Sequence, residues 1–237
     1  MKRNLIMLTL TILLAGCATR MSSEVYFRDL DDLPDGDLTN KIVFHLPLPS
    51  TDECEEYKTR YNKVFKKSND FKEMEYVNCV DGDMNDYIEY ELDVPLRLTN
   101  PVESKMTGAV EFIRFSDEDA EDSRLIFIRS NPPSLYNLDE LLEDEFYHGL
   151  DLSDTAPVIR LSNDLRSDQV FIVTHAFVQN KPVIKPTSFV LEPRDDIDIR
   201  LSDVTSAWIF HISAKADPRF ALVGVWSTTD DDDNDGE

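Results

Sequence analysis

An alternating pattern in the middle of the chain constrains the fold most strongly. Along residues 86–98 the apolar side chains fall on every second position, at Ile88, Tyr90, Leu92 and Val94. Because successive side chains of a strand point to opposite faces, this segment is predicted to be one long strand with a buried and an exposed face. A strand of this kind needs a sheet to join and a second layer to cover its apolar side.

The second half of the chain is predicted to be mainly β. β-branched and aromatic residues gather in short runs separated by turns, at residues 107–115, 124–130, 158–161, 169–178, 187–191, 207–214 and 220–226. Such runs are typical of an antiparallel sandwich or barrel. One helix is expected among them, capped by Asn137 with Glu140 in the capping-box position. A single helix in such a region would cover an open edge or end of the sheet.

The first half of the chain is predicted to be a small α/β sandwich. Strands are expected at residues 24–30, 41–46 and 71–80, and a capping box at residues 50–53 opens a helix that ends near residue 67. The overall prediction is therefore an α+β protein. One helix lies on an antiparallel sheet in an α/β subdomain of residues 25–100, and residues 101–229 form a mainly antiparallel β sandwich or barrel-like subdomain.

The amino terminus has the pattern of an exported lipoprotein. Lys2 and Arg3 precede an apolar run at residues 5–14, which is too short to span a bilayer. The next residues, Leu14-Ala15-Gly16-Cys17, resemble the bacterial lipobox. The resemblance implies cleavage before Cys17, acylation of its thiol, and anchoring of the mature protein to the bilayer by buried acyl chains. The alternative is an ordinary secretory peptide in which the cysteine occurs by chance.

The lipobox divides the start of the chain into two expected parts. Residues 1–16 are predicted to be a signal peptide, and residues 17–24 a lipidated tether that reaches about 25 Å when fully extended. In resembling proteins of bacteria with two membranes, an Asp after the lipidated Cys retains the product at the inner membrane. Ala18 in this position indicates the outer membrane instead.

The cysteines indicate a disulfide. Cys17 belongs to the lipobox, which leaves Cys54 and Cys79 as a pair in a chain exported to an oxidising compartment. On the predicted helix Cys54 lies on the same stripe as Tyr57 and Tyr61 and faces the core. The strand expected at residues 71–80 can bring Cys79 beneath it. Two thiols without a nearby His are too few ligands for a metal site.

The charge of the chain argues against nucleic acid as a partner. The formal net charge is -23, and removal of Lys2 and Arg3 with the signal peptide lowers it to -25. Such a surface is expected to repel nucleic-acid phosphates and anionic lipid head groups. Residues 230–237 contain six acidic residues and are predicted to be a disordered tail. Weak capture of a divalent cation, or contact with a basic partner, is the alternative role for this tail.

No catalytic or metal-binding motif is recognised in the sequence. The four histidines, which lie in different segments and are expected to be structural, are His45, His148, His175 and His211. The acidic segment that begins at Asp81 resembles a calcium loop only in part, because the sixth position is Asp86 rather than Gly and the twelfth is Leu92. A calcium site of another kind remains an alternative. The prediction is that the protein has no cofactor, no resident metal and no enzymatic activity.

A second resemblance concerns bacteriophage proteins. The segment Val25-Tyr26-Phe27-Arg28-Asp29-Leu30 after the lipobox, and the spacing of Asp52, Cys54, Tyr57 and Cys79, are similar to small lipoproteins encoded by phages and prophages. The resemblance covers residues 1–98. It implies an envelope protein made during lysogeny or infection, which can block a receptor and exclude a second phage. It supplies no catalytic residue.

These observations lead to one expected function and two alternatives. The expectation is a non-enzymatic lipoprotein of the outer membrane that binds an envelope protein through strand edges, loops or its acidic surface. The first alternative is an assembly lipoprotein of a secretion or conjugation machine. The second is a cell-wall hydrolase that uses a pair of carboxylates.

Overall fold

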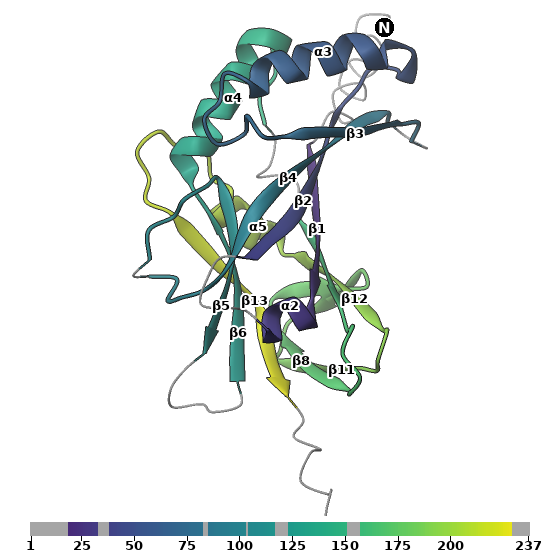
Figure 1. Ribbon diagram of the computed structural model, residues 1–237, viewed down its shortest axis with the longest axis vertical. Helices are drawn as coiled ribbons and strands as arrows, with labels where there is room; N and C mark the ends of the chain where they lie inside the picture. Colours follow the sequence, from purple (N-terminus) through teal and green to yellow (C-terminus); the bar gives the residue numbers. More distant parts are fainter. Residues whose placement is uncertain are drawn as a thin grey trace, which may run out of the picture.

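A computed structural model describes residues 19–32, 38–82, 85–102, 104–116, 123–150 and 157–228. Strands from all parts of this range form one large, nearly closed sheet with a few helices attached (Figure 1). The α+β class and the barrel-like sheet are as predicted. Cys17, the predicted lipidation residue, and residues 230–237, the predicted acidic tail, lie outside the described residues.

The described residues form thirteen strands and a small number of helices. The strands are β1 (Arg20–Tyr26), β2 (Leu38–Pro47), β3 (Glu75–Val80), β4 (Tyr87–Leu98), β5 (Val110–Ser116), β6 (Ser123–Ser130), β7 (Val158–Ser162), β8 (Gln169–Val173), β9 (Ala176–Val178), β10 (Lys181–Val183), β11 (Thr187–Leu191), β12 (Asp196–Leu201) and β13 (Arg219–Thr228). The helices are α2 (Phe27–Asp31), α3 (Cys54–Phe65, preceded by the 3-10 turn Thr51–Glu53), α4 (Pro132–Phe146) and α5 (Asp203–Ile209).

The two halves of the chain share one sheet and one hydrophobic core. The strand order is β10-β9-β12-β7-β1-β2-β4-β5-β6-β13-β8-β11, and β3 pairs with the first part of β4, residues 87–91. Two contacts join the segments before and after residue 100, β1 with β7 and β4 with β5, and both of these pairs are parallel. The core is continuous between them, since Phe27 of the first half lies 5.0 Å from Trp226 and 6.0 Å from Phe171, measured between ring centroids.

The alternation that predicted the long strand is present in β4. Ile88, Tyr90, Leu92 and Val94 are all buried, whereas Asp93 between two of them is exposed. The apolar side of β4 lies beneath α3, where the Tyr90 hydroxyl donates to the Lys58 carbonyl oxygen over 3.1 Å. The period of two in the sequence thus fixes which face of the sheet receives the helix.

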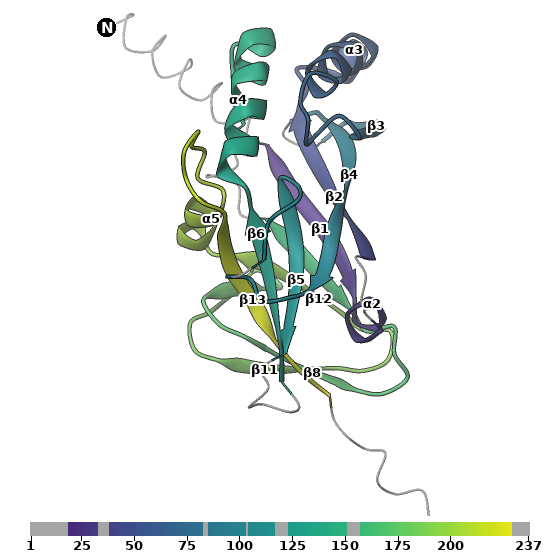
Figure 2. The same cartoon turned by 60° about the vertical axis from the view of Figure 1, so that its left-hand side comes forward.

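Helices α3 and α4 pack together at one end of the sheet (Figure 2). The rings of Tyr61 and Phe146 stack with their centroids 4.3 Å apart, and Glu145 of α4 lies 2.7 Å from the Lys63 ammonium. Helix α4 begins at Pro132 and not after Asn137 as expected. Pro132 and Pro133 explain the earlier start, because proline has helical φ and needs no partner for an N–H at the first turn.

Several expected elements differ in the structure. Residues 207–214 were expected to be a strand, but residues 207–209 are the end of α5 and residues 210–214 form no strand. The Ser202 hydroxyl caps this helix by accepting from the Thr205 N–H over 3.2 Å. The strand expected at residues 169–178 is divided into β8 and β9, because His175 has a φ of 53° that an extended strand excludes. Strands β10 and β12 were not predicted at all.

The start of the described chain differs from the expected tether. Strand β1 begins at Arg20 rather than at residue 24, and Thr19 before it is only 1% exposed. The segment from Phe27 onward forms α2 rather than continuing the strand. The chain therefore enters the fold only two residues after Cys17, which shortens the reach expected for a tether of residues 17–24.

The predicted disulfide is present in the structure. Cys54 and Cys79 are bonded, with their Cα atoms 6.2 Å apart, and the bond ties the first turn of α3 to β3. Replacing both residues with Ala is expected to lower the free energy of unfolding by about 3 to 3.5 kcal/mol, since the bond closes a loop of roughly 26 residues. Urea unfolding of both proteins measures this difference. Reduction of the wild-type protein should give the same shift, and an unchanged midpoint in both experiments would contradict the prediction.

Candidate functional site

A hollow of about 650 Å³ lies on the sheet, lined mainly by polar and charged residues of β1, β2, β4, β7 and β12 and by Asp29 of α2. Strand β1 shows why its polar side chains face the hollow. Met21 and Val25 are buried on the core side, so the alternate residues Ser22 and Glu24 face outward. The charged residues that line the hollow are Glu24, Asp29, Lys41, Glu91, Arg160 and Asp198.

Five of the six charged groups in the hollow bind a side chain on a neighbouring strand. The Arg160 guanidinium donates two hydrogen bonds to the Asp198 carboxylate, at 2.8 and 3.1 Å. The Lys41 ammonium donates to Glu91 over 2.7 Å, and the Glu24 carboxylate accepts from the Ser162 hydroxyl over 2.7 Å. The hydrogen bond that Arg160 donates to Asp198 raises the pKa of Arg160, and the one that Lys41 donates to Glu91 raises the pKa of Lys41. Both cations therefore stay charged at physiological pH.

These ion pairs shape the hollow more than they stabilise the fold. The side chains of Arg160 and Asp198 are 48% and 40% exposed, and that of Lys41 is 59% exposed. Water and salt screen pairs of this kind, so each contributes little to the free energy of unfolding. What they provide is a surface on which positive and negative groups hold fixed positions. Such a surface distinguishes between partners by the positions of their own polar groups.

A hydroxyl, an imidazole and a carboxylate form a chain at the rim of the hollow. The Ser22 Oγ lies 3.3 Å from His45 Nε2, and His45 Nδ1 lies 3.4 Å from Glu89 Oε1. This order is that of a nucleophile, its base and an orienting acid. However, β1 is paired on both sides at Ser22, with Val43 and Val158, so the sheet uses the backbone N–H groups that an oxyanion hole would need. The three side chains thus form a polar contact between strands, at a place where the backbone of β1 is engaged in the sheet.

Burial shifts the pKa values of the two titratable groups in this contact, His45 and Glu89. Desolvation lowers the pKa of His45, and the nearby charge of Arg20 lowers it further. Desolvation also raises the pKa of Glu89. The contact between His45 and Glu89 therefore joins a neutral imidazole to a carboxylate at neutral pH, although the two atoms are close enough for an ion pair.

The lowered pKa of His45 predicts that stability decreases in mild acid. A group whose pKa is lower in the folded state gives its full stabilisation above its unfolded pKa, about 6.5, and loses it as the pH falls through the folded value. The free energy of unfolding should therefore drop between pH 7.5 and pH 5.5, and this drop should be smaller in His45→Gln. Urea unfolding at several pH values measures it. The exposed His211 offers a matched control, because His211→Gln should retain the wild-type slope. Equal slopes in all three proteins would show that His45 does not contribute.

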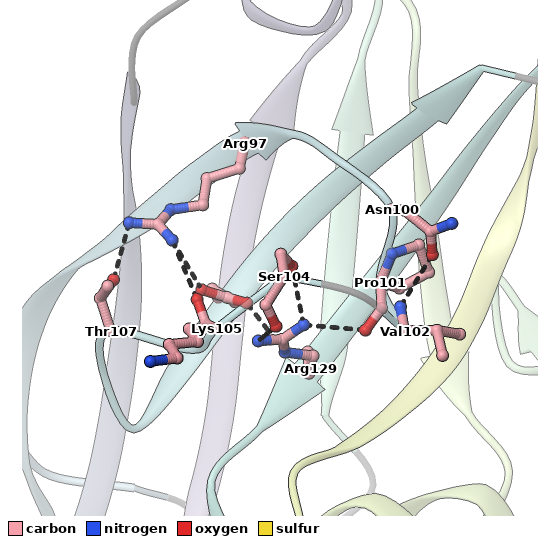
Figure 3. Close-up of polar contacts among 9 residues, drawn as sticks. Arg97, Asn100, Pro101, Val102, Ser104, Lys105, Thr107 and Arg129 are labelled. Atoms are coloured by element: carbon pink, nitrogen blue, oxygen red, sulfur yellow. Dashed lines mark hydrogen bonds and ion pairs between the residues drawn. The ribbon is translucent and has the colours of Figure 1, made fainter.

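A second polar cluster lies inside the fold (Figure 3). The side chains of Arg129 and Glu111 are 2% and 0% exposed, and Arg129 Nε lies 2.9 Å from Glu111 Oε1. The same guanidinium donates to the carbonyl oxygens of Pro101 and Ser104, over 2.8 and 2.9 Å. Arg129 thus binds one end of the connection between β4 and β5.

Arg97 binds the other end of the same connection. Its guanidinium donates to the Lys105 carbonyl oxygen over 3.3 Å and to the Thr107 hydroxyl over 2.8 Å (Figure 3). It also lies 3.9 Å from Glu111 Oε2. Because β4 and β5 run parallel to each other, this connection has to carry the chain back from the end of β4 toward the end of the sheet at which β5 begins. The two arginines fix this return path, so the cluster supports the fold and offers no open binding surface.

The residues predicted from the sequence do not lie in the hollow. Cys54 and Cys79 join α3 to β3, and neither lines the hollow. Asp86, from the calcium-like segment, accepts the Thr51 N–H over 2.7 Å and so supports the start of the helix. Residues 83–84 of that segment lie outside the described residues. In the part of the chain that the structure describes, no group of three His, Cys, Asp or Glu side chains is placed to hold a metal ion.

The fold and the hollow place the protein in the α+β class, with a nearly closed sheet that carries paired charges on one face. The chain belongs to the family described as domain of unknown function DUF7424, which it matches over residues 19–215. No curated protein and no solved structure gives a significant match. None of the helices in the described range is long and apolar enough to cross a membrane.

Proposed function

We propose that the protein is a lipid-anchored binding protein of the bacterial outer membrane, held by acylated Cys17, and that it recognises an envelope protein through the hollow without catalysing a reaction. The observation that carries this proposal is the set of paired charges on an open sheet face, with Arg160 and Asp198 on one side and Lys41 and Glu91 on the other. A protein segment with its own polar groups fits such a surface better than an apolar small molecule does.

The position of β1 supports an envelope partner. Glu24 lines the hollow and follows Cys17 by seven residues, so an extended chain places it within about 25 Å of the lipid. From Arg20 on, this chain is part of β1, so Glu24 holds a fixed position relative to the point where the chain enters the fold. The hollow therefore lies within reach of proteins embedded in the same membrane.

Site-specific photocrosslinking in intact cells tests the binding proposal. A photoreactive residue at Val43, which lines the hollow, is expected to capture one envelope protein. The same residue at Val190, which is 62% exposed on the edge strand β11, is the matched control and should not capture it. In Arg160→Glu the crosslink at Val43 should be lost, and the exchange Arg160→Asp with Asp198→Arg should partly restore it. Identical captures from both positions, or a crosslink that survives Arg160→Glu, would contradict the proposal.

The captured partner also separates the expected roles. A phage receptor would support superinfection exclusion, and cells that express the protein should then resist plating by phages that use that receptor. A component of a secretion or conjugation machine would support the assembly role. Both roles keep the hollow as the binding site and differ only in the partner.

The hydrolase alternative has a direct test of its own. Purified protein is incubated with cell walls, and release of soluble fragments is compared between wild type and Glu24→Gln. Binding without catalysis predicts no release by either protein. Release that depends on the Glu24 carboxylate would replace the binding proposal with a hydrolase.

A further inference from the structure

The basic residues of this acidic chain are unevenly distributed. In a chain of net charge -23, residues 58–72 contain a single acidic residue, Asp70. The same segment contains six basic residues, Lys58, Arg60, Lys63, Lys66, Lys67 and Lys72. Most of them lie on α3 or directly after it. The charge therefore changes along α3, from the exposed acids Glu55 and Glu56 in its first turn to basic residues in its second half and directly after it.

Helix α3 turns part of this basic segment to solvent. Its buried side consists of Tyr61, Val64 and Phe65, which pack against the end of the sheet. Lys63, Lys66 and Lys67 are exposed, and we call these three residues the basic face of α3. Lys63 is paired with Glu145 of α4, whereas Lys66 and Lys67 form no ion pair within the described part of the chain.

The basic face lies at the end of the molecule where the described chain begins. Arg20, the first residue of β1, is paired with His45 near the end of β2. Two residues later in β2, the Pro47 carbonyl oxygen accepts from the Tyr61 hydroxyl of α3 over 2.9 Å. Helix α3 crosses this end of the molecule, and β13 ends at the opposite end (Figure 1).

We infer that the basic face of α3 rests on anionic lipid head groups of the bilayer that holds the protein. The inference depends on the proposed acylation of Cys17. Only Ala18 separates Cys17 from the buried Thr19, so the lipidated residue lies within about 7 Å of the folded chain. An anchor this short keeps this end of the molecule at the membrane surface.

The net negative charge of the protein does not prevent this contact. Charges interact with a membrane over about 8 Å at physiological salt, so only the groups close to the surface matter. Strand β13, the last described element, ends away from α3. The exposed acids near this end are Glu55 and Glu56 in the first turn of α3 and Glu143 and Asp144 of α4. Their repulsion from the head groups favours an orientation in which the end of α3 and the residues directly after it, rather than these acids, lie against the lipid. Each lysine near an anionic surface increases binding about fivefold.

Amine labelling of the full-length lipidated protein in vesicles tests the inference. The protein is inserted into preformed vesicles of phosphatidylcholine, with or without about 30 mol% phosphatidylglycerol, an anionic lipid whose head groups attract basic segments. Mass spectrometry then measures how fast an acetylating reagent modifies each lysine. Lys66 and Lys67 should react severalfold more slowly in the anionic vesicles, and added salt should restore their rate. The matched controls are Lys181 of β10 and Lys185, which follows that strand. Both are exposed, and β10 lies at one end of the strand order, several strands away from β4. Each should react at the same rate in the two kinds of vesicle.

Flotation of the same samples separates failure of the inference from failure of the anchor. If the protein floats with both kinds of vesicle but Lys66 and Lys67 react at the same rate in each, the basic face does not contact the lipid. If both lysines are protected equally without phosphatidylglycerol, the contact does not depend on anionic head groups, and the inference is also wrong. If the protein floats with neither kind of vesicle, the anchor itself is absent and the inference is overturned with it.

Discussion

Glu111→Ala is expected to lower the free energy of unfolding by about 3 to 5 kcal/mol, because it leaves the Arg129 guanidinium charged and without its carboxylate inside the fold. Both side chains are almost completely buried, with Arg129 Nε 2.9 Å from Glu111 Oε1. Burial lowers the pKa of Arg129, and the carboxylate of Glu111 opposes this effect. Removing the carboxylate therefore removes the main interaction that keeps the buried cation favourable.

Chemical denaturation of the full chain measures the effect. Glu91→Ala is the matched control, because Glu91 also pairs with a cation over a short distance, but its partner Lys41 is exposed to solvent, so its loss should cost less than about 1 kcal/mol. Glu111→Gln keeps the shape of the side chain and removes its charge, so it should lower the free energy of unfolding by most of the amount that Glu111→Ala does. Similar losses from Glu111→Ala and Glu91→Ala would show that burial of the pair is not decisive.

Arg129→Met should have a different consequence from the loss of Glu111. It removes the hydrogen bonds to Pro101 and Ser104 as well as the ion pair, so the connection between β4 and β5 loses one of its two supports. The combined change Glu111→Leu with Arg129→Met leaves no unpaired charge, yet it still lacks the hydrogen bonds to the connection. Its stability relative to Glu111→Ala therefore separates the cost of an unpaired charge from the cost of a free loop.

The sequence predicted those features that local periodicity determines. The alternation at Ile88, Tyr90 and Leu92 identified β4 and its buried face, because a period of two is a direct property of an extended chain. The disulfide followed from the same kind of pattern, since Cys54 lies on the apolar stripe of a helix that the next strand passes. Each of these predictions needed only neighbours within about thirty residues.

Other features depended on signals that composition concealed. Residues 207–214 contain Trp208, Ile209 and Phe210, which favour a strand by propensity, but a cap at Ser202 starts a helix before them. The opposite occurred at β12. Its apolar residues Ile197 and Ile199 alternate with charged ones, as in a strand, but the density of charge in this segment is typical of a loop. In both places a positional signal was present and composition was the poorer guide.

The hollow could not be predicted because its walls are distant in the sequence. Its paired charges come from β1, β2, β4, β7 and β12, and Ser162 reaches Glu24 only because β7 runs parallel to β1. No periodicity within one segment specifies which strands become neighbours. A sequence can place Glu24 on an exposed face, but the register with Arg160 and Ser162 is a property of the whole sheet.

Cys17→Ser is expected to abolish both acylation and membrane attachment. The thiol is the proposed site of lipidation, and acyl chains buried in the bilayer contribute about 0.8 kcal/mol per methylene, so losing them should release the protein completely rather than in part. Metabolic labelling with palmitate, followed by fractionation of wild type and variant, measures both effects. The variant with both Cys54 and Cys79 changed to Ser is the control, since it lacks the disulfide but should keep its label.

The outcome of this experiment also decides how the hollow is presented to a partner. With Cys17 acylated, the short path to Arg20 keeps the α3 end at the lipid and gives the sheet face a fixed height above the membrane. A released but folded Cys17→Ser protein should therefore bind the same partner in solution yet fail to capture it in intact cells at its normal abundance, because anchoring raises the effective concentration of two proteins in one membrane. Normal palmitate labelling of Cys17→Ser, or an unmodified thiol in the wild-type protein, would disprove the anchor and this consequence together.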